Sequence, residues 1–370
     1  MKTVGIYIHI PFCAQKCDYC DFISHCDKSN LIEEYIEKLK EEIKSDFSNK
    51  EYKVTTIYIG GGTPSFIDSK YIVDILNILK EKYNLENTEI TIEVNPGTVT
   101  EEKLLDYKNV GINRLSIGLQ ETNNELLKQI GRIHTCEEFL ETYNLARNLG
   151  FKNINVDLMI GLPNQSIQNI KESLNKVITL NPEHISVYSL ILEEGTKLYK
   201  KYEENEIELP DEELERNMYW YVKNTLENNG YNHYEISNFS KKGYESKHNI
   251  NCWEQKEYIG FGLNAHSYVD GVRYSNTEIL EKYIKGSNKI IHEKQTIEDM
   301  KKEYMLLGLR KIKGVSIQKF EEKFVENPIF LFRNELNKLV EQELLEVDGD
   351  VIKLTNKGLD LANIVWEEFV

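Results

Sequence analysis

The stretch "VGIYIHIPFCAQKCDYCDF", residues 4–22, joins an apolar segment to a loop that holds three of the six cysteines in this 370-residue chain. The apolar segment predicts a buried strand. Cys13, Cys17 and Cys20 follow it, and Asp21 stands where a fourth cysteine would be sought. Six cysteines scattered over a chain of this length do not indicate a disulfide framework. The clustered trio therefore predicts a metal site or a catalytic site.

Five more strand-like stretches follow, and helical patterns alternate with them along the first half of the chain. They are "TTIYIGGGTPS" (55–65), "EITIEVNPG" (89–97), "INRLSIGLQ" (112–120), "NINVDLMIGLP" (153–163) and "HISVYSLIL" (184–192). Six strand–helix repeats in order imply parallel strands covered by helices, which is an α/β fold. We expect a partial (β/α)6 barrel of the TIM type. An open doubly wound sheet is the alternative, because periodicity does not fix strand order.

The pattern changes twice along the chain, which predicts three parts. Residues 1–195 form the barrel core, and residues 196–295 form a helical and irregular extension over the barrel mouth. Residues 296–370 form a small winged-helix-like domain, with a hairpin turn at Asp348-Gly349. Residues 301–370 hold eleven Lys and Arg against thirteen Asp and Glu. This balance favours a structural or protein-contact role for the domain over DNA binding.

Composition restricts the classes of partner and the location. A formal net charge of −16 argues against nucleic acid as a partner, because such proteins need a concentrated positive face. No stretch approaches the roughly 18 apolar residues of a membrane span. The N-terminus lacks the pattern of a signal peptide. We therefore expect a cytoplasmic protein.

Unusual polar residues stand at or near the ends of the predicted strands. Gly60–Pro64 follows the second strand, Glu93 and Gln120 lie at the ends of the third and fourth, and Asp157 lies in the fifth. In parallel α/β folds these ends meet at one mouth, where ligands bind. The triple glycine allows backbone N–H groups to approach a ligand carboxylate or phosphate. Glu93 ends an apolar strand and needs a partner, such as a ligand ammonium group or ribose hydroxyls.

Three cysteines at this spacing suit a [4Fe–4S] cluster, which ordinarily takes four thiolates. With three, one iron keeps an open position for a ligand that is not protein. The alternative is a zinc site of three cysteines with His25 or His9. Spacing alone leaves both interpretations open.

Taken together, the motifs resemble the radical S-adenosylmethionine superfamily, and most of all its coproporphyrinogen-dehydrogenase branch. "YIHIPFC", "GGGTPS", "EVNPG", "RLSIGLQ", "GRIH" and "DLMIGLP" occur in order, and "YEISNF" and "GFGLNAHSY" follow later. The resemblance implies that the three cysteines hold the cluster, whose open iron chelates S-adenosylmethionine. An electron passed through the cluster then cleaves this cofactor to give a 5′-deoxyadenosyl radical. The residues implied to bind S-adenosylmethionine are Tyr7, Tyr19, Gly61, Gly62, Thr63, Glu93, Gln120, Arg132 and Asp157.

Within this branch the chain resembles the HemW heme chaperones more than the dehydrogenases. The dehydrogenases carry CxxxCxxCxC, and here Phe22 stands at the last cysteine. The chaperones carry an HNxxYW motif proposed to bind heme. This chain has "HNINCW", with His248 as the heme-ligand candidate and Cys252 in place of the tyrosine. His266 is the second candidate.

The resemblance implies a heme chaperone that binds a [4Fe–4S] cluster, S-adenosylmethionine and heme, and that passes heme to hemoproteins. Whether it cleaves S-adenosylmethionine as an enzyme is left open. The alternative is an oxygen-independent coproporphyrinogen III dehydrogenase, and a third possibility is a zinc-stabilised binding protein. The expected partners are membrane-associated acceptor hemoproteins, an electron donor such as flavodoxin or ferredoxin, and a second copy of the chain. Heme delivery implies peripheral association with the membrane.

Overall fold

A computed structural model describes residues 2–46, 52–286 and 289–370 of the chain. All six predicted strands form, and each pairs in parallel with the next in sequence. They are β1 Thr3–Ile10, β2 Lys53–Gly61, β3 Glu89–Val94, β4 Arg114–Gln120, β5 Ile154–Ile160 and β6 His184–Ser189. This sequential order is that of a barrel, and it excludes the doubly wound alternative, whose strand order reverses. The sheet stays open because β1 and β6 pair on their outer sides with β9 and β8.

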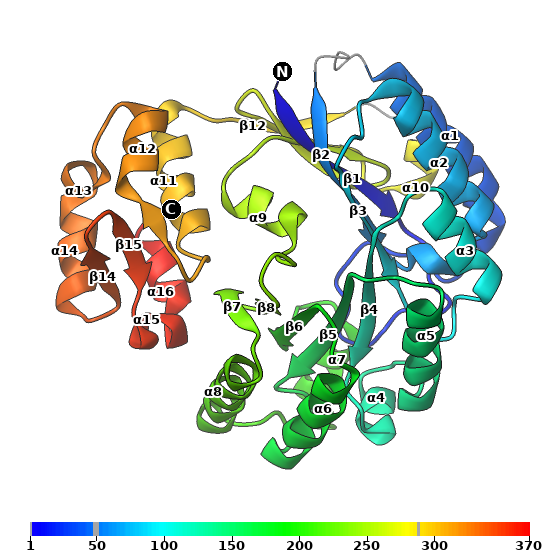
Figure 1. Cartoon of the computed structure of the whole chain (residues 1–370), viewed down its shortest axis with the longest axis horizontal. Helices are drawn as coiled ribbons and strands as arrows, with labels where there is room; N and C mark the ends of the chain where they lie inside the picture. Colours follow the sequence, from blue (N-terminus) through cyan, green and yellow to red (C-terminus); the bar gives the residue numbers. More distant parts are fainter. Residues whose placement is uncertain (1, 47–51, 287–288) are drawn as a thin grey trace.

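Helices cover the convex face of this sheet (Figure 1). They are α1 Ile32–Ser45, α2 Ser69–Lys82, α3 Glu101–Asn109, α4 Asn124–Gln129, α5 Cys136–Asn148 and α6 Ile167–Leu180. Strand β3 shows how the sequence separates the two faces. Ile90, Ile92 and Val94 join the hydrophobic core, whereas Glu89 and Glu93 alternate with them and face the concave side. The concave face is therefore polar.

The segment 196–295 contains helices, as predicted, and also six strands that were not predicted. Its helices are α7 Lys197–Glu203, α8 Glu212–Asn228, α9 Lys247–Trp253 and α10 Leu280–Ile284. Its strands are β7 Asn232–Glu235, β8 Asn238–Ser240, β9 Tyr258–Phe261, β10 His266–Val269, β11 Val272–Ser275 and β12 Ile290–Lys294. They extend the same sheet to twelve strands across the described residues. At three to five residues, such strands are too short to show a clear period in the sequence.

The C-terminal part has its own hydrophobic core and a three-stranded antiparallel sheet. Its elements are α11 Ile297–Gly308, β13 Val315–Ser316, α12 Ile317–Phe324, α13 Pro328–Leu331, α14 Arg333–Glu341, β14 Leu345–Asp348, β15 Val351–Leu354, α15 Asn356–Asp360 and α16 Ala362–Glu367. The predicted hairpin between β14 and β15 forms, and Gly349 supplies its positive φ of 57°. The boundaries at 195 and 295 stay predictions.

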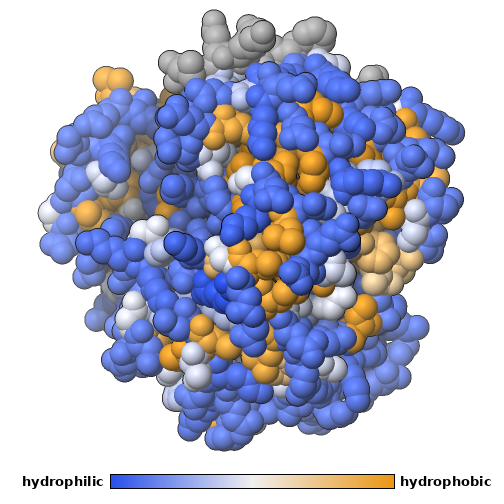
Figure 2. Space-filling view, turned by 45° about the vertical axis from the view of Figure 1, so that its right-hand side comes forward, coloured by the Kyte–Doolittle hydropathy of each residue, from blue (hydrophilic) through white to orange (hydrophobic). Residues whose placement is uncertain are grey.

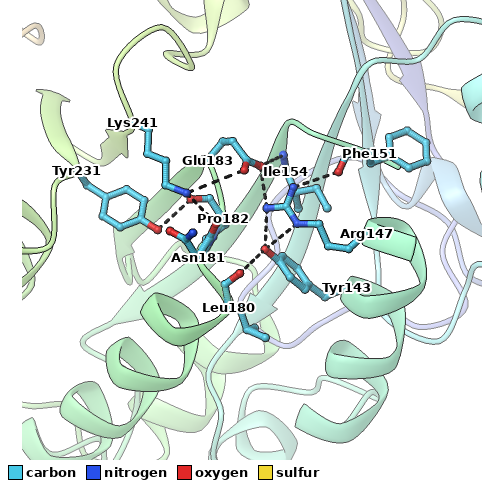
Figure 3. A network of polar contacts seen from close by, with 10 residues as sticks. All are labelled: Tyr143, Arg147, Phe151, Ile154, Leu180, Asn181, Pro182, Glu183, Tyr231 and Lys241. Atoms are coloured by element: carbon cyan, nitrogen blue, oxygen red, sulfur yellow. Dashed lines mark hydrogen bonds and ion pairs between the residues drawn. The ribbon is translucent and has the colours of Figure 1, made fainter. Parts of the chain in front are cut away.

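A polar network joins elements at the amino ends of β5 and β6 (Figure 3). The Arg147 guanidinium on α5 contacts the Glu183 carboxylate at 2.8 Å and donates to the Tyr143 hydroxyl at 2.7 Å. Glu183 also accepts from the backbone N–H of Ile154 at 3.1 Å. Lys241 donates to the carbonyl of Asn181 at 2.8 Å. The network fixes β5, β6 and α5 relative to one another, far along the strands from their carboxyl ends.

The face shown in Figure 2 is mostly hydrophilic, with apolar side chains in smaller areas between charged ones. Within the described ranges we find no helix with the length and apolar character needed to cross a bilayer.

Candidate functional site

A cavity of about 380 Å³ lies at the carboxyl ends of the parallel strands. Eleven predicted site residues line it: Cys13, Cys17, Tyr19, Cys20, Gly61, Gly62, Thr63, Glu93, Gln120, Arg132 and Asp157. The parallel topology thus brings together residues that are up to 144 positions apart. Tyr7 does not line the cavity, because it lies three residues before the end of β1 and its hydroxyl contacts His9 Nδ1 at 3.0 Å. His248 does not line it either.

The cysteine loop is held by backbone contacts from distant segments. The N–H of Cys13 donates to the carbonyl of His25 at 3.1 Å, which closes the loop on itself. Asp18, between two of the cysteines, donates to Ile130 at 3.0 Å and accepts from Leu198 of α7 at 2.7 Å. A loop tied at several points loses little further freedom when it binds a ligand. The three cysteines are therefore presented on one wall of the cavity.

The sulfur atoms have polar neighbours that suit thiolate ligands. The Thr63 hydroxyl donates to Cys13 Sγ at 3.5 Å, and Arg132 Nη1 lies 3.6 Å from Cys17 Sγ. Burial raises the pKa of the Cys13 thiol and raises that of Cys20 to about 11. Compensating positive charge is needed for ionised sulfur here, and Arg132 supplies part of it. Iron bound by the thiolates would supply the rest, so the donor set fits an iron–sulfur cluster.

The zinc alternative was predicted to use His9 or His25. His9 contacts the carbonyl of Ile23 through Nε2 and the Tyr7 hydroxyl through Nδ1, so both of its ring nitrogens have partners. Within residues 2–46, 52–286 and 289–370, no three His, Cys, Asp or Glu side chains are placed to hold one metal ion. The structure gives the zinc interpretation no support.

The triple glycine is required by packing inside the protein. A Cβ at Gly62 would lie 3.0 Å from Cys13 Sγ, and one at Gly61 would lie 2.6 Å from the His9 ring. The N–H groups of Gly61 and Gly62 donate to Glu93 and to the carbonyl of Ile10. In this structure both N–H groups are therefore used within the protein, and the binding of S-adenosylmethionine by Gly61 and Gly62 stays a prediction. The glycines instead let the second strand approach the cysteine loop.

Two half-buried carboxylates face the cavity. Glu93 accepts from the Tyr58 hydroxyl at 2.9 Å, and burial raises its pKa to about 7. Asp157 accepts from Asn155 Nδ2 at 2.7 Å and from the Ser116 hydroxyl at 3.2 Å, and burial raises its pKa as well. A cationic or hydroxyl-bearing ligand would stabilise their charged forms.

Arg132 connects the strands to the cysteine loop. Its Nη2 donates to Asn95 Oδ1 at 2.9 Å and to the carbonyl of Gly118 at 2.8 Å, while Nη1 reaches Cys17. Gln120 has a positive φ of 68° at an irregularity of β4, a backbone conformation that is uncommon for a residue with a side chain. Strained backbone at a cavity is typical of functional sites.

Eleven further residues line the cavity and are absent from the predicted set, among them Tyr58 and Ser116. Both face the concave side because strand residues alternate between the two faces. Polar side chains at every second position of an otherwise apolar strand are the signal that identifies them. The same alternation in "RLSIGLQ" also places Arg114 on that face.

His248 belongs to α9, a helix that lies on the concave side of the sheet (Figure 1). Its Nδ1 contacts the Thr56 hydroxyl at 2.9 Å, and its ring stacks on Tyr58 with 5.2 Å between centroids. The Glu89 carboxylate accepts from the first two N–H groups of α9, those of Lys247 and His248, at 3.0 and 3.3 Å. Burial lowers the pKa of His248 to about 4, so its imidazole is neutral at physiological pH.

The other residues considered for heme lie elsewhere or are chemically unsuited. His266 is exposed on β10 and stacks on His292 with 5.3 Å between centroids. Burial raises the pKa of Cys252 to about 11, which keeps this thiol protonated.

The fold and the cavity agree with family comparisons. Residues 7–177 match the Radical SAM superfamily, and residues 296–361 match the HemN C-terminal domain. The chain is therefore a radical S-adenosylmethionine protein, a class that uses a [4Fe–4S] cluster and S-adenosylmethionine.

Curated relatives narrow the assignment. The chain is 39% identical to the heme chaperone HemW of Lactococcus lactis, over 100% of this chain and 98% of the relative. It is 38% identical to the heme chaperone HemW of Bacillus subtilis, over 98% of each. The chain belongs to the HemW family.

A solved structure confirms the fold. Coproporphyrinogen III oxidase (HemN) from Escherichia coli, a radical SAM enzyme, matches with a TM-score of 0.86 and 23% identity, over 100% of this chain and 90% of that chain.

Proposed function

We propose that this protein binds heme and delivers it to acceptor hemoproteins. Full-length relatives named as heme chaperones support the proposal, and so does the geometry of His248. The proposal includes a cytoplasmic protein that associates peripherally with the membrane during delivery, a flavodoxin or ferredoxin as electron donor, and a homodimer.

The chemistry of His248 is the observation that carries the proposal. With Nδ1–H donating to the Thr56 hydroxyl, Nε2 keeps its lone pair. Nε2 makes no hydrogen bond to any residue of the described ranges. A neutral imidazole with one nitrogen fixed by the protein and the other unused suits an axial ligand of heme iron. The Tyr58 ring holds the imidazole plane in place.

His248 is covered in this structure, with 8% of its surface exposed. Heme is much larger than the opening this leaves, so α9 has to move for iron to reach Nε2. The C-terminal domain contacts α9 and the residues after it. Arg310 lies over the Trp253 ring at 4.4 Å, and Lys323 donates to Gln255 at 2.8 Å. We infer that heme entry and release involve a shift of α9 against this domain.

In the cavity, Cys13, Cys17 and Cys20 would hold the cluster. Glu93 would pair with the ammonium group of S-adenosylmethionine, and Asp157 would accept from its nucleoside. When bound, cluster and cofactor supply one-electron radical chemistry, while the protein orients and shields them. Arg132 would keep Cys17 in place and add positive charge near the sulfur atoms.

Anaerobic heme titration tests the proposal. Wild type should bind heme with the absorption spectrum of a histidine ligand, and His248→Ala should lose that spectrum. His266→Ala is the matched control and should bind like wild type. Equal, weak binding by wild type and His248→Ala would refute this site. Conversion of coproporphyrinogen III to protoporphyrinogen over many turnovers would instead establish the dehydrogenase alternative.

A further inference from the structure

Arg114 is a buried cation for which the described residues provide no ion-pair partner. It begins β4, and 2% of its surface is exposed. Its Nε is buried and makes no hydrogen bond, and its guanidinium forms no ion pair with a carboxylate of the described ranges. Burying an unpaired charge is costly, so such a residue calls for an explanation.

Its position on the sheet relates Arg114 to the cavity. Arg114, Ser116 and Gly118 lie on one face of β4, and the latter two line the cavity. Arg114 therefore lies one layer below the cavity floor. Its register partner on β3 is Thr91, whose hydroxyl is also buried and without a partner. Two adjacent strands thus present unused polar groups side by side.

The neighbouring carboxylates are engaged with other donors. Glu89 accepts from the amino end of α9, Glu93 from Tyr58, and Asp157 from Asn155. Burial raises the pKa of Glu89, and the charge of Arg114 acts against this rise. Burial lowers the pKa of His248, and the charge of Arg114 lowers it further. Arg114 therefore interacts electrostatically with the His248 imidazole of α9 and with Glu89, which holds the amino end of that helix. The carboxyls of Glu89, Glu93 and Asp157 interact with the charge of Arg114 at longer range, and none of the three forms an ion pair with its guanidinium.

The missing partner is best supplied by a ligand carboxylate. A guanidinium binds a carboxylate through paired, charge-assisted hydrogen bonds, and a threonine hydroxyl adds a further donor. Heme carries two carboxylates on one edge, while its iron offers an axial position to a histidine. The α9 shift that uncovers His248 also removes the helix end that Glu89 holds, two residues from Thr91 on the same face of β3.

We propose that Arg114 and Thr91 form a subsite for a carboxylate of heme, with iron bound to His248. The inference rests on the proposed function, because it assumes heme as the ligand of this space. It assigns specificity: the protein should distinguish porphyrins by the charge at their edge as well as by their iron.

Two ligands that differ only in this charge test the subsite. Heme and heme dimethyl ester are titrated anaerobically into the full-length protein carrying its cluster. Wild type should prefer heme by about tenfold or more, since hydrogen bonds to charged groups have that order of effect. Arg114→Met should bind the two ligands equally, Arg114→Lys should keep part of the preference, and Thr91→Val should reduce it slightly.

The outcomes separate the two proposals. His248→Ala should lose the histidine-ligated spectrum with both ligands and keep the preference for heme. If heme binds without any dependence on His248, the proposed function fails at this site. If binding depends on His248 while Arg114→Met keeps the full preference for heme, the subsite alone is refuted. Unchanged melting temperature and iron content of Arg114→Met exclude misfolding. Should that variant misfold, the comparison of Arg114→Lys with wild type decides.

Discussion

The cavity at the strand ends and the covered site formed by His248 and Arg114 lie on the same concave face of one sheet. The two sites differ in exposure and in the segments that form them. The cavity is formed by the ends of consecutive strands and stays open. The covered site consists of His248 on α9 and Arg114 on β4, both of which are buried by contacts between distant segments. Thr56 and His248, for example, lie 192 positions apart.

This difference has a functional consequence. A cavity lined by fixed strand ends suits cofactors that stay bound during a reaction. A covered site that opens by a helix shift suits a ligand that is taken up and then given away, because closure is a separate equilibrium. The C-terminal domain contacts the α9 region and supplies none of the residues that line the cavity. Tyr58 belongs to both sites, because it lines the cavity and stacks on His248. Substitutions at other residues should affect the two sites separately.

Removing a cluster ligand should give the largest difference between the two sites, with the cluster lost and heme binding kept. Cys17→Ala should lose the brown colour, the iron and the sulfide of the reconstituted protein, because the cavity supplies three cysteine ligands for the cluster and none to replace Cys17. Heme binding to the same variant should persist, since His248 belongs to the covered site. Cys26→Ala is the matched control, because Cys26 is an exposed cysteine a few residues away. Cluster retention in Cys17→Ala would contradict the assignment of the ligands.

The pH dependence of S-adenosylmethionine binding should report on Glu93. Burial raises the pKa of this carboxyl to about 7, so it is mostly neutral at pH 6 and mostly charged at pH 8. Only the charged form attracts an ammonium group, so affinity should rise about tenfold between these values. Calorimetric titration of Glu93→Gln should show weaker binding without this rise. Glu125→Gln, an exposed surface change, should behave like wild type. The same slope in Glu93→Gln would exclude this role.

Loosening α9 should affect only the covered site. Arg310 lies between Trp253 and Trp366, at 4.4 and 4.8 Å from their rings. Cation–π contacts of this kind contribute about 1 kcal/mol. Arg310→Ala should therefore speed heme association about fivefold, because the open state becomes more populated. Stopped-flow absorbance measures this rate, with the exposed-ion-pair variant Lys338→Ala as control. A slower rate in Arg310→Ala would show that the domain does not hold α9 closed.

The open cavity was largely predictable from the sequence, and the covered site was not. Glu93 lies near the end of β3 and Asp157 within β5, at polar positions that local alternation identifies, and parallel topology then brings them together. The covering of His248 depends on Thr56, Tyr58 and Glu89, which no local pattern connects with α9. Contacts at such separation are set by tertiary packing.

The glycine loop shows a second limit on what the sequence can predict about the site. Its sequence correctly predicted a close approach of the backbone, because glycine lacks Cβ. The sequence did not reveal which group lies next to the glycine backbone. In the structure the neighbour of Gly62 is Cys13, and the N–H groups are used within the protein.

Strands β7–β12 were missed for a different reason: each is short, and β9 pairs with β1 across about 250 residues.

The smallest effect should come from the polar network at the amino ends of β5 and β6, which includes no residue of either site (Figure 3). Glu183→Gln removes the charge that Arg147 contacts at 2.8 Å and weakens the bond from Ile154. Loss of one partner from a half-buried charged network costs about 1–2 kcal/mol, a few degrees in melting temperature for a chain of this size. Glu125→Gln, which removes an exposed ion pair, should change it by less. Cluster content and heme affinity of Glu183→Gln should match wild type, because the network lies in neither site. A selective loss of heme affinity would instead show that the covered site depends on this polar network more than the open cavity does.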